Sequence, residues 1–200
     1  MTAALDLSAL DREGYLVLPA VLSAEDVAAV RAQVEAALGT AEHARQGGTV
    51  HVGQLAGPPI DRMREALLPA VRHVLGPDAE LRNAHFRGPL PGHGGQALHA
   101  DFGGPPPPEP AVAVAVVALV DVTEDGGATR VVPGTHRWAK GAPGGDPTRR
   151  HPDEKRIPLV AGSALLFNGH LWHSGTRNDS ARRRDALQVT FARPGAVWSP

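Results

Sequence analysis

Residues 111–134 read AVAVAVVALVDVTEDGGATRVVPG, and this stretch decides the fold class. Residues 111–122 are almost all Ala, Val and Leu, which is typical of a strand that is buried on both faces. The sequence Glu-Asp-Gly-Gly that follows is a turn signal, and Thr-Arg-Val-Val then predicts a short second strand that Pro-Gly ends. Short strands separated by such turns favour a β-sandwich or jelly roll over a βαβ fold.

Short strands of the same kind are predicted on both sides of this stretch. They cover residues 14–19, 81–88, 157–160, 164–167, 171–174 and 186–191. Two helical patterns precede most of them. Ser23 is a suitable N-cap whose capping box is completed by Asp26, and apolar residues then follow at helical spacing until Gly39. Residues 60–75 form the second pattern, which Pro69 is expected to kink or divide into two short helices.

The chain is therefore expected to form one domain over residues 1–200. Residues 1–80 would be a mostly helical flank, in which each helix covers a face of a sheet, and residues 81–195 would form the mainly β jelly-roll core. Two segments resist assignment to strands, namely the proline-rich residues 103–110 and the polar loop 137–156. Because long loops in compact domains are often lids, both could cover a substrate. Plain surface loops are the alternative.

The composition excludes several classes of protein. A formal net charge of -1 gives no electrostatic basis for binding nucleic acid or an anionic membrane. The sequence has no cysteine, so disulfides and thiolate metal sites are excluded. It has no apolar run of membrane-spanning length and no signal-peptide pattern. We expect a cytoplasmic monomer or homodimer that acts on a small molecule, and the abundance of Ala, Gly, Pro and Arg suggests a GC-rich bacterial genome.

Three residues form a candidate metal site. In His99-Ala100-Asp101, an extended backbone would point His99 and Asp101 to the same side. His173 would add a second imidazole from a different strand. Two histidines and one carboxylate, with other positions left open, form the ligand set that suits Fe(II) in oxygen-using enzymes. The sequence contains 10 histidines, so a chance match with solvated side chains is the alternative interpretation.

Taken in order, these motifs resemble the phytanoyl-CoA dioxygenase-like family of Fe(II)/2-oxoglutarate-dependent oxygenases. The matching segments are residues 11–19, 22–26, 99–101, 126–136 and 173–191. The resemblance implies a double-stranded β-helix (jelly roll, cupin-like) that holds Fe(II) on His99, Asp101 and His173 and uses 2-oxoglutarate and O2 as co-substrates. It also implies hydroxylation of a small molecule, for instance in bacterial secondary metabolism, with release of succinate and CO2.

The resemblance also assigns the co-substrate ligands. The family pattern places an arginine eleven residues after the second histidine ligand, which is Arg184 in this chain. A guanidinium can form a two-pronged bond with the remote carboxylate of 2-oxoglutarate. Arg182 is the alternative if the register is shifted. Asn178 also matches the pattern, and Arg87 corresponds to a basic residue on the strand before the His-x-Asp motif.

One departure from the family pattern concerns the second residue after the distal histidine. The family often has a serine there, which helps to hold the co-substrate, but this chain has Gly175. Ser174 or Thr176 would have to replace that serine. A cupin-like protein with the same metal ligands but no use for 2-oxoglutarate therefore remains an alternative.

Four other residues are candidate substrate ligands. Phe102 and Trp172 flank the metal ligands, and Gln96 and Asn83 are polar residues that could contact the substrate or the co-substrate. Core packing for the two aromatic residues, and ordinary turn or strand-edge roles for the two polar ones, are the alternatives. Three other histidines are not expected to bind the metal. His136 is expected to have a structural role in a turn, His170 to be out of step with the metal ligands, and His85 to lie near the pocket.

The ligand set leaves the reaction itself open. Asp101 would fill the metal position that chloride takes in related halogenases, so we expect oxygenation rather than halogenation. Desaturation, cyclisation and epimerisation can use the same cofactors and are alternatives to hydroxylation. Because histidine must be neutral to bind a metal, metal binding and activity are expected to weaken below about pH 6.5.

Overall fold

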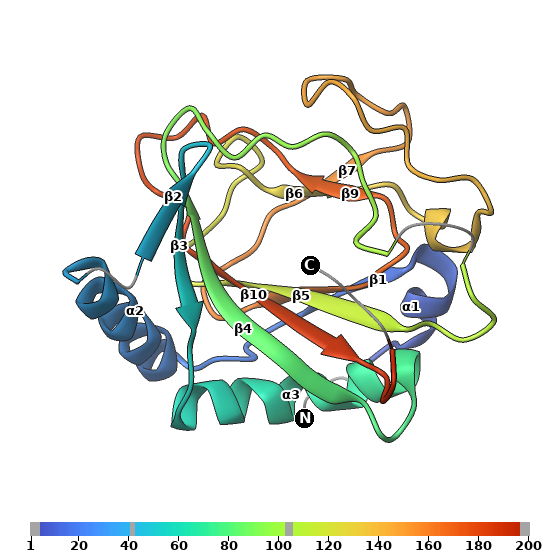
Figure 1. The fold of residues 1–200 in the computed structure, drawn as a ribbon, viewed down its shortest axis with the longest axis horizontal. Coiled ribbons are helices and arrows are strands. Elements are labelled where there is room, and N and C mark those ends of the chain that lie inside the picture. Colours follow the sequence, from blue (N-terminus) through green and yellow to red (C-terminus); the bar gives the residue numbers. More distant parts are fainter. Residues whose placement is uncertain (1–4, 41–42, 103–105, 197–200) are drawn as a thin grey trace.

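The computed structural model describes residues 5–40, 43–102 and 106–196. These residues form two antiparallel sheets that face each other, with helices outside the larger one (Figure 1). The larger sheet has the order β1 (Tyr15–Leu18), β8 (Ala164–Asn168), β5 (Val112–Ala118), β10 (Ala186–Ala192), β4 (Glu80–Pro89), β3 (Thr49–Gln54) and β2 (His43–Gln46). The smaller sheet has the order β7 (Lys155–Ile157), β6 (Thr129–Val131) and β9 (His173–Gly175). This arrangement confirms the predicted jelly-roll fold.

Strand β5 shows how the larger sheet separates the main core from the space between the sheets. Successive side chains of a strand point to opposite faces. Ala113, Ala115 and Val117 pack in the main core with the helices, whereas Val114 and Val116 face the space between the two sheets. Both faces of β5 are buried, as its composition predicts, although the strand ends at Ala118.

Helix α2 (Ala24–Leu38) begins as predicted from its capping box. The Ser23 hydroxyl accepts a hydrogen bond from the Asp26 N–H at 3.1 Å, and the Asp26 carboxylate accepts one from the Ser23 N–H at 3.4 Å. Arg62 of helix α3 (Pro58–Leu75) donates its Nε–H to the same carboxylate at 3.1 Å. This bond with Arg62 lowers the pKa of Asp26 to about 2, so one charged group both caps α2 and joins it to α3.

Helix α3 (Pro58–Leu75) is continuous, so the expected division at Pro69 does not occur. Proline removes one hydrogen-bond donor from the helix, which leaves the carbonyl of Glu65 without its usual partner. Both residues are exposed, so water can hydrate that carbonyl. On the opposite side of α3, Met63, Leu67 and Val71 are completely buried and hold the helix against the sheet.

Helices α2 and α3 both cover the outer face of the larger sheet, and they share one apolar core with it. Two shorter helical segments, α1 (Ser8–Glu13) and η1 (Thr135–Arg137), lie beside β1 in Figure 1. No helix within the described ranges is long and apolar enough to cross a membrane. The inner face of the larger sheet is therefore left free to form one wall of a site.

The hairpin β2–β3 is an element that the sequence analysis does not predict. It extends the larger sheet beyond β4, within the region expected to be mostly helical. Its turn is Gly47-Gly48, and both glycines have a positive φ, of 54° and 74°. A two-residue Gly-Gly connection between two extended runs is a hairpin signal, and it could have been read from the sequence.

Candidate metal centre

His99 and His173 face each other across an antiparallel backbone bridge. The N–H of His99 donates to the carbonyl of His173 at 3.0 Å, and the N–H of His173 donates to the carbonyl of His99 at 2.8 Å. His173 begins β9, whereas His99 lies in a loop rather than in the expected strand. The centroids of the two imidazole rings are 4.5 Å apart. Backbone pairing thus brings together two side chains that are distant in the sequence.

The two imidazoles direct the same nitrogen toward Asp101. The Nδ1 atoms lie 2.8 Å and 2.9 Å from the carbonyls of Ala97 and Leu171, respectively. Donation from Nδ1 to these carbonyls leaves Nε2 available for a metal. The carboxylate of Asp101 lies 3.8 Å from the Nε2 of His99 and 3.5 Å from that of His173, which is long for hydrogen bonds.

The residues present fit a divalent metal such as Fe(II). Their candidate ligand atoms all lie within 4.8 Å of one another. The Oδ2 atom of Asp101 is buried and has no hydrogen-bond partner among the described residues, which is costly for a carboxylate unless a cation binds there. Burial lowers the pKa of His173, although the negative charge of Asp101 acts in the opposite direction. The neutral imidazole that results is the form that binds metals.

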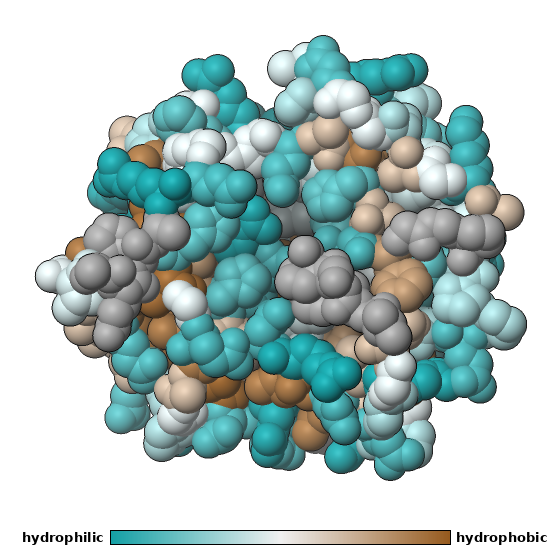
Figure 2. Space-filling view, viewed as in Figure 1, coloured by the Kyte–Doolittle hydropathy of each residue, from teal (hydrophilic) through white to brown (hydrophobic). Residues whose placement is uncertain are grey.

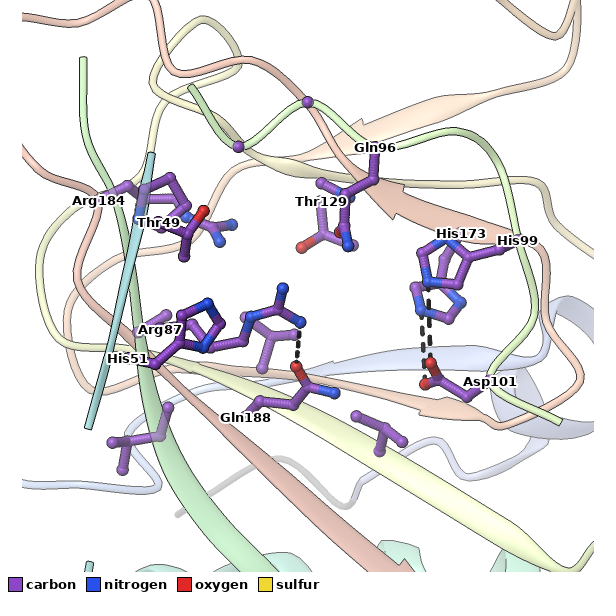
Figure 3. A pocket seen from close by; sticks show the side chains of 18 of the residues that line it. Thr49, His51, Arg87, Gln96, His99, Asp101, Thr129, His173, Arg184 and Gln188 are labelled. Carbon is purple, nitrogen blue, oxygen red and sulfur yellow. Dashed lines mark hydrogen bonds and ion pairs between the residues drawn. The ribbon is translucent and has the colours of Figure 1, made fainter. Parts of the chain in front are cut away.

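A cavity of about 310 Å³ extends from these three residues between the two sheets. Figure 3 shows the two histidines and Asp101 at one end, Arg184 and Thr49 at the other, and Arg87 with Gln188 between them. Hydrophilic side chains predominate around the centre of this side of the molecule, whereas apolar ones appear at its lower edge over α3 (Figure 2). The cavity is suited to a small polar molecule that reaches from the triad to Arg184.

Arg184 and Arg87 bring two positive charges into this cavity. Arg184 donates Nη1–H to the carbonyl of Gly127 at 2.9 Å, and its buried Nε has no partner in the described chain. Burial, followed by the nearby charge of Arg87, lowers the pKa of Arg184 to about 10. Arg87 donates to the side-chain oxygen of Gln188 at 2.7 Å. A buried guanidinium with unused donors is suited to bind an anion.

The sequence of this chain matches the model of the phytanoyl-CoA dioxygenase (PhyH) family over residues 10–186. The chain belongs to the PhyH family. A curated relative is Dioxygenase FUM3 of Gibberella moniliformis (strain M3125 / FGSC 7600), which is 36% identical over 133 residues. That match covers 61% of this chain and 42% of the relative, so the chain spans less than half the length of the curated relative it matches.

Two solved structures have the same fold as this PhyH-family chain. The epimerase SnoN, in complex with Fe3+, alpha ketoglutarate and nogalamycin RO, aligns with a TM-score of 0.77 at 22% identity, over 97% of this chain and 84% of SnoN. HygX from Streptomyces hygroscopicus, with nickel and 2-oxoglutarate bound, aligns with a TM-score of 0.78 at 18% identity, over 97% of this chain and 88% of HygX. At these identities the likeness concerns the fold.

Arg184 and Arg182 are the two arginines predicted to bind the remote carboxylate of 2-oxoglutarate. Arg184 lines the cavity of this PhyH-family chain, and Arg182 does not. Arg182 is exposed, and it lines a separate surface pocket with Arg31. Asn178 is fully buried and donates its side-chain amide to the carbonyls of Pro89 and Arg182, at 3.1 Å and 2.7 Å. Asn178 therefore fixes the segment before Arg184 against β4 and does not face the cavity.

The structure places neither Ser174 nor Thr176 in the cavity, in contrast to the expected replacement of the family serine. Ser174 accepts a hydrogen bond from Nε of Arg130 at 2.6 Å, and Thr176 donates to the carbonyl of Ala128 at 2.7 Å. The physical reason is strand alternation, because neighbours of an inward-facing residue point outward. Gly175 does line the cavity, but a Cβ there would lie 2.8 Å from the carbonyl oxygen of Gly94. A serine therefore does not fit without a shift of the backbone.

Of the four candidate substrate ligands, Gln96 alone lines this cavity, and its side-chain oxygen accepts a hydrogen bond from the N–H of Gly175 at 3.2 Å. Asn83 lies on β4 opposite Thr190, outside the lining, with a buried and unpartnered side-chain oxygen. Phe102 and Trp172 line a second cavity on the other side of the segment that carries His99. Both adjoin His99 there, in a different cavity from Gln96, and their role as substrate ligands stays a prediction.

The remaining histidines divide between structural positions and the walls of the cavities. His136 packs so closely against Gly14 that a Cβ there would clash with its ring, which agrees with a structural role. His170 is buried beside Phe102 in the second cavity. His85 is on β4, two residues from Arg87, and burial lowers its pKa to about 4.

Sequence reasoning missed several cavity residues, namely Thr49, His51, Thr129 and Gln188. Two of them belong to the unpredicted strand β3. His51 pairs with Arg87 across β3 and β4, and burial lowers its pKa. A correct prediction of the hairpin would have placed His51 beside Arg87, since cross-strand partners share a face.

Proposed function

We propose that this chain is an Fe(II)- and 2-oxoglutarate-dependent oxygenase that hydroxylates a small molecule. One observation carries the proposal. A His-Asp-His triad, in which one carboxylate oxygen accepts no hydrogen bond from the described residues, lies at one end of a cavity, and an arginine with unused donors lies at the other end. A small dicarboxylate such as 2-oxoglutarate has one end for the metal and a second, anionic end for Arg184.

Each part of the chain has a defined task in this proposal. His99, His173 and Asp101 would hold the iron through two nitrogens and one carboxylate oxygen, leaving other positions open. Arg184 would bind the remote carboxylate of the co-substrate, and Arg87 would add positive charge beside it. When bound, the iron and 2-oxoglutarate would activate O2, which is the oxidant: one oxygen atom would enter succinate as 2-oxoglutarate loses CO2, and the other would hydroxylate the substrate.

The apolar part of the cavity has a role of its own. Val114, Val116, Phe167 and Leu187 line it beside the polar groups. Their side chains exclude water, which strengthens the bonds of the two arginines with an anion. We infer that Asp101 favours oxygenation over halogenation, since a carboxylate occupies the position that a halide would need.

The names of the structural neighbours support a small-molecule substrate of secondary metabolism. The SnoN complex contains nogalamycin RO, and HygX has been solved with hygromycin B. SnoN is named an epimerase and SnoK a carbocyclase, so epimerisation and cyclisation are second candidates on this fold. Product masses separate the reactions, because hydroxylation adds one oxygen, desaturation or ring closure removes two hydrogens, and epimerisation changes nothing.

Spectroscopy under anaerobic conditions tests the proposal. Addition of Fe(II) and 2-oxoglutarate should give a weak visible charge-transfer band. Arg184→Ala should remove this band at the same 2-oxoglutarate concentration, whereas the exposed control Arg182→Ala should retain it. A fully metal-loaded wild type that gives no band would instead support a cupin-like protein without the co-substrate.

A further inference from the structure

The second cavity is the strongest candidate for a site that the proposed function leaves unused. It has a volume of about 300 Å³, at the lower end of the range for small-molecule sites. It lies between the segment that carries His99 and the loop after η1, which is drawn in yellow-orange in Figure 1. His99 lines both cavities, so a molecule held here would adjoin the metal centre.

Aromatic side chains gather in this cavity. The whole chain has 3 Trp, 1 Tyr and 4 Phe, and Trp138, Trp172 and Phe102 all line this one space. The two tryptophan rings meet edge to face with centroids 5.1 Å apart, and Phe102 lies 5.1 Å from the ring of His170. Trp138 is 43% exposed although it is a large apolar residue. Exposed aromatic surface at the edge of a cavity favours a planar, apolar ligand.

Two polar groups in the cavity have no partner within the part of the chain that the structure describes. His170 is 6% exposed, and its buried Nε2 has no hydrogen-bond partner among the described residues. Lys140 is exposed at the cavity and forms no ion pair with the acids of the described ranges. An ammonium beside aromatic walls complements a ligand that carries an acidic group on a ring.

The wall of this cavity is fixed to the rest of the fold. The N–H of Gly144 donates to the carbonyl of Leu98, directly before His99, at 3.1 Å. Farther along the same loop, the carbonyls of Pro147 and Arg149 accept hydrogen bonds from the buried Arg130 at 3.1 Å and 2.8 Å. These hydrogen bonds hold the loop against the segment that carries His99, so specific contacts fix the wall of the cavity.

We propose that this cavity binds a planar aromatic ring system with an acidic substituent and that it holds this part of the substrate beside the metal centre. The inference rests on the proposed function, since it names the class of substrate for the same site. The rings of Trp138 and Phe102 would contact the ligand's ring, Lys140 would pair with its acidic group, and His170 would donate or accept one hydrogen bond.

Binding of 1-naphthoate to the anaerobic enzyme loaded with Fe(II) and saturated with 2-oxoglutarate tests this inference. Saturation with 2-oxoglutarate keeps the naphthoate carboxylate away from Arg184. We expect naphthoate to bind, and Trp138→Leu to weaken binding about tenfold through loss of ring contact. Because Trp138 is partly exposed, this variant should fold, and its unfolding midpoint checks that it does.

The charge in the site is tested separately from the ring contacts. Lys140→Gln should weaken naphthoate binding about threefold to fivefold and leave the neutral 1-naphthamide unchanged. Lys155→Gln, an exposed lysine on β7, is the matched control and should change neither ligand. Fluorine NMR of 4-fluoro-1-naphthoate tests the position, since Fe(II) should broaden its signal relative to diamagnetic Zn(II).

The proposal is overturned if naphthoate does not bind at millimolar concentration, or if it binds the wild type and Trp138→Leu equally well. It fails too if 2-oxoglutarate displaces naphthoate, because the two molecules would then share one site. It is also overturned if Lys140→Gln weakens both ligands equally or if Fe(II) leaves the fluorine signal unbroadened. The charge-transfer band recorded in the same samples reports 2-oxoglutarate binding independently. Failure of the proposed function is therefore distinct from failure of this inference.

Discussion

Arg130 of β6 and Glu154 of the long loop form an ion pair of 3.0 Å in which each side chain is only 4% exposed. Arg130 also donates to the hydroxyl of Ser174 at 2.6 Å and to the carbonyl of Gln96 at 3.1 Å. Burial raises the pKa of Glu154, but hydrogen bonds from His151 and Arg150 and the charge of Arg130 hold it below its usual value. One guanidinium thus joins the loop, β9 and the segment before the first metal ligand.

Loss of this pair should destabilise the fold strongly. We expect Arg130→Met to lower the free energy of unfolding by about 3–5 kcal/mol, because it removes the buried charge partner of Glu154 and leaves only the exposed Arg150 beside this carboxylate. Urea denaturation measures this change. Arg150→Gln is the control, since Arg150 is 68% exposed and its bond to Glu154 should contribute less than about 1 kcal/mol. Equal losses of stability in the two variants would contradict the conclusion that Arg130 is the main charge partner of Glu154.

Gly175 should not tolerate the serine that the family often has at this position. The added Cβ would lie 2.8 Å from the carbonyl oxygen of Gly94 and 3.2 Å from the side-chain oxygen of Gln96. We expect Gly175→Ser to destabilise the protein by about 1–3 kcal/mol and to weaken 2-oxoglutarate binding by displacing Gln96. Thermal unfolding and titration of the charge-transfer band measure both effects. Gly53→Ser, where a Cβ meets nothing within 4 Å, is the control, and unchanged stability of Gly175→Ser would refute the steric argument.

Removal of the carboxylate at Asp101 should remove most metal affinity. Changes in groups that only orient metal ligands cost about 10–100-fold in affinity, so we expect at least about 100-fold for Asp101→Ala. Competition with a chelating dye measures the dissociation constant. Asp153→Ala, whose side chain is 76% exposed, should leave affinity unchanged. An Asp101→Ala variant that binds Fe(II) as the wild type does would rule Asp101 out as a ligand.

Stability should fall in mild acid because of His85. Burial, followed by the charges of Arg87 and His51, lowers the pKa of His85 to about 4, from an ordinary value of about 6.5. Between these values the unfolded chain binds a proton that the folded chain does not, so acidification through this range favours unfolding. The contribution of His85 should be on the order of 1 kcal/mol after allowance for its partial exposure.

The measurement for His85 is urea denaturation between pH 7 and pH 4 for the wild type and His85→Gln. Other histidines with lowered pKa values, including His51 and His170, also destabilise the fold on acidification. The effect of His85 is therefore the difference between the wild type and the variant in how much unfolding free energy each loses. The variant should lose less stability on acidification. Parallel pH curves for both proteins would show that His85 is not protonated differently in the folded state.

The sequence predicted those features that depend on near neighbours. The Ser23–Asp26 cap, the buried strand around Val114 and most strand positions follow from local patterns, and the structure has them. The Gly47-Gly48 hairpin signal before β3 is present in the sequence, but the predicted elements include no hairpin there and so leave His51 unplaced. Alternation along β9 would have shown that Ser174 and Trp172 point away from His173.

By itself, the sequence determined the fold class, because cap, turn and period-two patterns are properties of adjacent residues. The resemblance of its motifs to the phytanoyl-CoA dioxygenase-like family identified the family and supported the candidate ligands His99, Asp101 and His173. The tertiary structure decided which side chains share a space. It placed Arg184 rather than Arg182 in the cavity, separated Phe102 and Trp172 from Gln96, and left Asp101 Oδ2 without a hydrogen-bond partner among the described residues. These outcomes depend on pairing between distant strands and on burial, which local patterns do not encode.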